Sequence, residues 1–186
     1  MIKKNFLFFF FGLLAAFGAL VFELLILNIK SILSGIDITQ DYFSHLTTFL
    51  FIVALTEEFF KYILLQKISI HPSNNNSIFL PVIFFGLGFS FIEMFSFFYS
   101  SDHQSSFYAL KIFASISLHI LTSFILYTFI LFKQKNNLLS PILITVIFHF
   151  TFNTLIIYNL NYQLIYLYLG LLLVITILLK SKLSHN

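Results

Sequence analysis

The sequence of 186 residues contains no cysteine, no arginine and no tryptophan, and only 9% of its residues are charged. The absence of cysteine excludes a disulfide framework, a thiolate metal site and a thiol nucleophile. All ten basic residues are lysines, so the arginine forks that bind phosphates and base edges are missing and we expect no nucleic-acid partner. Soluble domains carry about 25% charged residues. A chain with so few charges cannot cover a water-facing surface, which excludes a soluble fold.

Apolar residues dominate what is present, at 59% of the chain with a mean hydropathy of +0.97. A transmembrane helix needs about 20 apolar residues, and six stretches approach this length. These stretches predict an all-α polytopic membrane protein, embedded in a lipid bilayer as a single domain over residues 1–186. The first stretch follows two lysines as a signal peptide would, but no small-residue cleavage site ends it, which favours a retained helix. The six predicted spans are about 5–27, 43–66, 78–99, 109–132, 141–159 and 163–180.

The lysines predict the orientation of these spans in the cell membrane. If both termini are cytoplasmic, seven lysines fall on the inner side and two, Lys30 and Lys111, on the outer side. Cytoplasmic loops carry the excess of positive charge in membrane proteins. We therefore expect both termini in the cytoplasm. The seven inner lysines are Lys3, Lys4, Lys67, Lys133, Lys135, Lys180 and Lys182.

Ionisable and amide side chains lie within the predicted spans, where a charge costs about 2.5–3.5 kcal/mol on insertion scales. Spans two to five each contribute, and the simplest explanation is one polar site shared by these four helices. Glu23 of the first span has no partner by spacing, so we interpret it as a local feature and expect its replacement by Gln to be nearly neutral. The residues of the shared site are Glu57, Glu58, Lys61, Glu93, His119, His149 and Asn153.

The spacing of these residues supports a shared site. Glu57 and Lys61 are four residues apart and occupy one helix face, as do His149 and Asn153. Glu58 is turned by about 100° from Glu57 around the helix. One of the two carboxylates can therefore pair with Lys61 while the other remains free.

Two glycines, Gly86 and Gly88, precede Glu93 and predict a close helix contact that brings this glutamate near its partners. Purely structural roles are the alternative for each polar group. Glu57 and Lys61 could form a buried ion pair that only holds helices together. His149 and Asn153 could make interhelical hydrogen bonds, and His119 could be a packing residue.

Four motifs in this order resemble the PrsW family of intramembrane proteases and, more distantly, the CPBP membrane proteins related to CAAX prenyl proteases. The resemblance covers about residues 43–160. Lys61 and Glu93 stand where the CPBP pattern has arginine and histidine, which favours PrsW, although Met94 replaces an asparagine common in the family. The first motif, EEFFK, contains Glu57, Glu58 and Lys61, and the second, GLGFSFIE, contains Gly86, Gly88, Phe89 and Glu93. The third is the isolated His119, and the fourth, HFTFN, contains His149 and Asn153.

The resemblance implies an intramembrane endopeptidase. Peptide hydrolysis needs an activated water, a stabilised oxyanion and a proton for the leaving amine. Either Glu57 or Glu58 would activate the water with help from His149, while Lys61 keeps one of the two acids ionised. Asn153 or His119 would donate a hydrogen bond to the oxyanion.

Members of the family are often described as metalloproteases, and the sequence offers a suitable ligand set. Glu93, His119 and His149, with Glu57 or Glu58, supply the nitrogen and oxygen ligands that zinc accepts. A metal-bound water and a glutamate-activated water both fit this set. The resemblance implies a membrane-protein substrate, such as a single-pass protein. Two alternatives stay open: a non-catalytic scaffold or immunity-type protein of the same fold, and a proton-coupled carrier, although the carrier predicts an internal repeat that we do not find.

Overall fold

The computed structural model describes residues 2–35, 46–69, 79–99, 108–131, 139–158 and 162–184, and their regular structure is α-helical throughout. Each helix overlaps one of the predicted spans. The helices are α1 (Ile2–Ser34), α3 (Leu46–Ser69), α4 (Phe79–Tyr99), α5 (Tyr108–Leu131), α6 (Leu139–Ile157) and α7 (Tyr162–Ser184).

Local sequence explains where several helices begin and end. Pro81 and Pro141 lie in the first turns of α4 and α6, where a missing N–H costs little. At the other end of α1, Gly35 has a φ of 65°, and its N–H donates to the Ser31 carbonyl at 2.9 Å. This left-handed cap suits glycine. α1 therefore runs for 33 residues, or about 50 Å, which exceeds a bilayer core of about 30 Å.

Among the described residues, three helices have the length and apolar composition needed to cross a membrane: α1, α5 and α6. The apolar stretches of α4 and α7 are shorter, at Phe79–Phe95 and Gln163–Leu179. α3 carries three charged residues near its middle, Glu57, Glu58 and Lys61. The exact number of membrane crossings stays a prediction.

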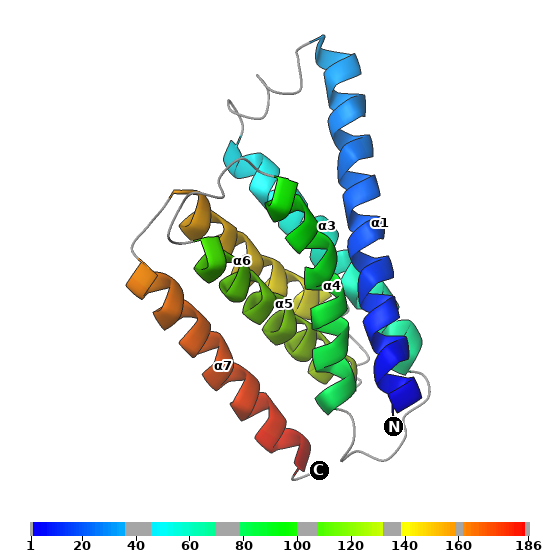
Figure 1. The fold of residues 1–186 in the computed structure, drawn as a ribbon, viewed down its shortest axis with the longest axis vertical. Helices are drawn as coiled ribbons and strands as arrows, with labels where there is room; N and C mark the ends of the chain where they lie inside the picture. The colour runs from blue at the N-terminus through cyan, green and yellow to red at the C-terminus, as the bar shows by residue number, and fades with distance from the viewer. Residues whose placement is uncertain are drawn as a thin grey trace.

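The bundle places α3, α5 and α6 at its centre (Figure 1). α1 packs mainly on α4 and also on α3, while α7 lies on α5 and, over a smaller area, on α6. The start of α1 and the end of α7 lie at the same end of the bundle (Figure 1). Large apolar side chains cover the outer faces of α1 and α7, as expected for helices that face lipid.

Glycines allow α4 to approach its two neighbours closely. A Cβ atom on Gly88 would collide with the Phe9 carbonyl oxygen of α1, and one on Gly12 would collide with the Phe85 carbonyl oxygen of α4. A Cβ on Gly86 would lie 2.7 Å from the Ile120 Cα of α5. α4 is thus held tightly between α1 and α5, which fixes the height of Glu93 relative to both helices.

Candidate functional site

Six polar side chains from four helices meet near the middle of the bundle. α3 contributes three of them, and α4, α5 and α6 contribute one each. Four of the six are almost completely buried, since Glu58, Lys61, His119 and His149 are at most 1% exposed. The structure therefore brings together Glu57, Glu58, Lys61, Glu93, His119 and His149.

Lys61 joins α3 to α5 through all three of its N–H donors. Its Nζ lies 2.6 Å from Glu58 Oε1, 2.9 Å from His119 Nδ1 and 3.1 Å from Thr122 Oγ1. A buried ammonium group is tolerated when each proton has an acceptor. Because Lys61 can only donate, His119 Nδ1 must accept, and in neutral His119 the proton is then on Nε2.

Phe89, the first phenylalanine of the α4 motif, packs against two members of this cluster. Lys61 Nζ lies 4.4 Å from the centre of its ring, within the range of a cation–π interaction. The rings of Phe89 and His119 are 4.7 Å apart between centroids. Phe89 therefore fixes the positions of both side chains from the apolar side.

Glu93 binds the opposite side of the His119 ring. Its Oε2 accepts hydrogen bonds from His119 Nε2 and from Ser115 Oγ, the latter at 2.6 Å. His119 is thus held between a cation at Nδ1 and a carboxylate at Nε2, and its ring orientation is fully determined.

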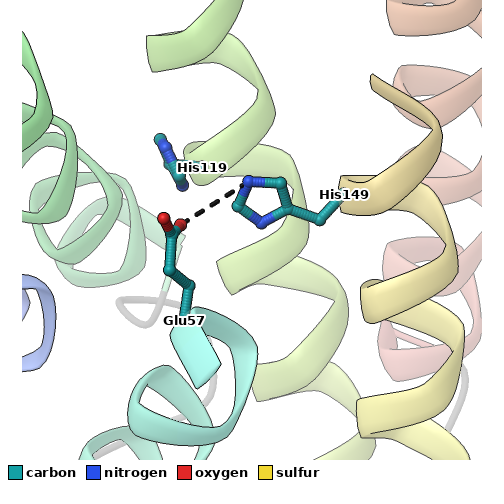
Figure 2. Close-up of side chains that lie close together, drawn as sticks. All are labelled: Glu57, His119 and His149. Carbon is teal, nitrogen blue, oxygen red and sulfur yellow. Dashed lines mark ion pairs between the residues drawn. The ribbon is translucent and has the colours of Figure 1, made fainter. Parts of the chain in front are cut away.

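Glu58 orients His149 in a similar way. Its Oε1 lies 2.8 Å from His149 Nδ1, and because a carboxylate accepts, Nδ1 is the donor. Neutral His149 then presents the lone pair of Nε2 toward Glu57 Oε2, 3.5 Å away (Figure 2). Glu57 Oε2 is buried and has no hydrogen-bond partner among the described residues. When His149 is neutral and Glu57 is ionised, both atoms offer an electron pair to a third species, whereas a protonated His149 pairs with Glu57 directly, as the dashed line in Figure 2 marks.

His119 completes this group. Its ring lies 5.1 Å from that of His149 between centroids, at 75°. One ligand atom from each of Glu57, His119 and His149 lies within 4.8 Å of the other two, and Figure 2 shows the three side chains converging from α3, α5 and α6. Two imidazoles and one carboxylate form one of the protein ligand sets of catalytic zinc sites, in which a fourth position stays open.

The structure differs from the spacing argument in two respects. Lys61 pairs with Glu58 at i,i+3 rather than with Glu57 at i,i+4. The ligand group contains Glu57, one of the two α3 carboxylates predicted with the histidines, whereas Glu93, also predicted as a ligand, is hydrogen-bonded to His119. In the described part of the chain, no hydrogen bond or ion pair joins Asn153 to the cluster.

Sequence reasoning missed two residues. Ser115 and Thr122 bind Glu93 and Lys61, and together with His119 they follow the i, i+4, i+7 spacing of one helix face, a signal that could have found them. Glu23 was interpreted as a local feature of the first helix. The structure instead places it close enough to Glu93 and Glu57 to interact electrostatically with both.

Comparison with known families gives one result over nearly the whole chain. The model of the PrsW-protease family, described as PrsW family intramembrane metalloprotease, matches residues 3–179. No curated protein and no solved structure matches the chain.

Proposed function

Because the chain belongs to the PrsW family of intramembrane metalloproteases, we propose that Glu57, His119 and His149 form its catalytic centre. The membership confirms the resemblance predicted from the four motifs. It identifies the chain as an all-helical membrane protein and a hydrolase that acts on membrane-protein substrates. It does not favour the scaffold alternative.

One observation supports this assignment above the others. His149 Nε2 and Glu57 Oε2 face each other at 3.5 Å with no hydrogen bond between them, and the Glu57 oxygen is buried without a partner. A buried polar atom without a partner carries a desolvation penalty. A cation between the two atoms would remove this penalty, so the donor set fits a divalent metal such as zinc.

Glu57, His119 and His149 would hold this metal. When bound, such an ion supplies Lewis-acid polarisation of the peptide carbonyl. His119 would give up one of its two present hydrogen bonds to join the set, since both of its nitrogens have partners.

The remaining chemistry belongs to the side chains. Glu57 has a second oxygen with which to accept a proton from the attacking water. The protonated Glu57 then donates this proton to the leaving amine, so the water is divided between the two products. Glu58 acts as a positioning residue because it fixes the tautomer of His149, and Lys61 holds Glu58 in place. The oxyanion role predicted for Asn153 stays a prediction.

We further propose that the substrates are single-pass proteins of the cell membrane and that both termini are cytoplasmic. The lysine distribution supports this orientation. The start of α1 and the end of α7 lie at the same end of the bundle in Figure 1, which is consistent with an even number of crossings.

The test uses the purified protein in detergent with a panel of single-span membrane proteins. We expect cleavage of at least one of them, loss of cleavage with a chelator and recovery with zinc. Cleavage that persists in an active, metal-free preparation would overturn the metal assignment. Full cleavage by the Glu57→Gln variant would overturn the assignment of the catalytic centre.

A further inference from the structure

Glu23 of α1 lies beside the cluster but takes no part in its hydrogen bonds. It is close enough to Glu93 of α4 and Glu57 of α3 to interact electrostatically with both. Its side chain is half-buried, and its Oε1 atom is fully buried with no hydrogen-bond partner among the described residues. A carboxyl group held in this way within a membrane-spanning helix needs a donor from outside the described protein.

The partly exposed edge of the cluster is formed by the two carboxyl groups with which Glu23 interacts. The inner members are at most 1% exposed, whereas the side chains of Glu57 and Glu93 are 14% and 28% exposed. These two residues belong to α3 and α4, the helices on which α1 packs. Glu23 therefore interacts with the members of the cluster that are open to a molecule arriving from outside.

The charge balance at this edge favours hydrogen-bond donors. The edge carries the carboxyl groups of Glu57 and Glu93, with Glu23 interacting with both, and the ammonium group of the cluster, that of Lys61, already has three acceptors. A peptide segment must leave its helical conformation before a protease can attack it, and within a membrane this frees N–H groups that have no water to bind. Donors of this kind match the free oxygen of Glu23.

We infer that Glu23 is a substrate-binding residue whose carboxyl group accepts a hydrogen bond from the substrate segment next to the scissile bond. The donor is either a main-chain N–H group or a basic side chain. This inference rests on the proposed function, because it assigns Glu23 to the substrate of the same centre.

The experiment compares Glu23→Leu and Glu23→Gln with the matched control Asn28→Leu. Asn28 is a polar residue on the exposed surface of the same helix, and its side chain bonds within that helix, to the Leu24 carbonyl at 2.7 Å. The assay is cleavage of a single-span substrate identified in the panel above, with KM, kcat and bound zinc measured for each variant.

We expect Glu23→Leu to raise KM about five- to tenfold, the scale of one lost hydrogen bond, with kcat and zinc content nearly unchanged. Asn28→Leu should leave KM unchanged. If the donor is a main-chain N–H, Glu23→Gln restores KM because the amide keeps an acceptor oxygen. If the donor is a cation, Glu23→Gln resembles Glu23→Leu, and only substrates with lysine or arginine near the cleavage site are affected.

A second measurement holds even if Glu23→Leu folds poorly. A photo-crosslinking amino acid at position 23, in a Glu57→Gln background that retains the substrate, should form an adduct with that substrate. The same amino acid at Phe17, which is 59% exposed on α1, should not. An unchanged KM in folded Glu23→Leu, or equal crosslinking at both positions, overturns the inference. These results leave the proposed function intact, which fails instead if Glu57→Gln cleaves normally.

Discussion

Glu58 Oε1 lies 2.8 Å from His149 Nδ1, and both side chains are completely or almost completely buried. This contact joins α3 to α6 and also determines which nitrogen of His149 faces Glu57. The same oxygen accepts a hydrogen bond from Lys61. The two adjacent glutamates of α3 therefore have different environments: Glu58 is held through Oε1 by two hydrogen bonds, whereas Glu57 Oε2 has no hydrogen-bond partner among the described residues.

This difference predicts unequal effects of two isosteric substitutions. Glu57→Gln removes the proton acceptor and one ligand, so turnover should fall by about 10²-fold or more, the usual scale for loss of a general base. Thermal stability should stay near that of the wild type, because Glu57 has no structural hydrogen bond at Oε2 to lose. The measurement is substrate cleavage normalised to folded protein.

Glu58→Gln should act mainly through His149. An amide can donate as well as accept, so it no longer enforces the tautomer that directs the lone pair of Nε2 toward Glu57. Loss of such an outer partner typically costs 10–100-fold in metal affinity, and we expect zinc titration of the purified variant to show a loss of about this size. Wild-type zinc affinity in a folded Glu58→Gln variant would contradict the positioning role.

Removal of a proposed ligand should change metal content directly. His149→Ala is expected to lower both bound zinc and cleavage, whereas His185→Ala, outside the motifs, should lower neither. Elemental analysis of both proteins, purified in parallel without added metal, provides the comparison. Equal zinc in the two proteins would exclude His149 as a ligand.

The sequence predicted the helical fold because the six apolar stretches are long and their interruptions polar, and each stretch overlaps one observed helix. Of the seven polar residues predicted to share a site because they are costly inside a membrane, all but Asn153 contact one another, namely Glu57, Glu58, Lys61, Glu93, His119 and His149. Spacing did not predict the partners of each residue. On one helix, Lys61 can reach back to position i−3 or i−4, and His119 and Thr122 of a different helix decide between them by holding the ammonium group near Glu58. The position of Glu23 could not be predicted from the sequence either. Its neighbours depend on the contact of α1 with α4, which is set by glycine packing.

This packing gives a prediction with an internal control. Gly12→Ala would place a methyl group against the Phe85 carbonyl oxygen, a backbone atom that cannot move aside unless α1 and α4 separate. The thermal midpoint and the cleavage rate should both fall. Gly170→Ala in α7 has open space within 4 Å, and because alanine favours helices by about 1 kcal/mol over glycine, its midpoint should be unchanged or higher. An equal response of the two variants would contradict the close contact.

The predicted orientation can be measured independently of activity. A reporter fused after Asn186 and another inserted within residues 100–107, both outside the described residues, should report opposite sides of the membrane, with the C-terminal reporter in the cytoplasm. Reports from the same side would remove at least one of the last three predicted crossings.

The buried pair of Lys61 and Glu58 predicts a non-additive effect on stability. Lys61→Met should be strongly destabilising, by about 3–5 kcal/mol, because it leaves the Glu58 carboxylate buried without its cation. Adding Glu58→Gln removes that uncompensated charge, so the double variant should recover part of the loss. Unfolding in detergent of the wild type, both single variants and the double variant completes the cycle. Cleavage should stay low in the double variant despite the recovered stability, because His119 and His149 have both lost the partners that orient them. Strictly additive losses would show that the two side chains do not stabilise one another, and recovered cleavage would show that their pairing is structural and has no part in positioning the histidines.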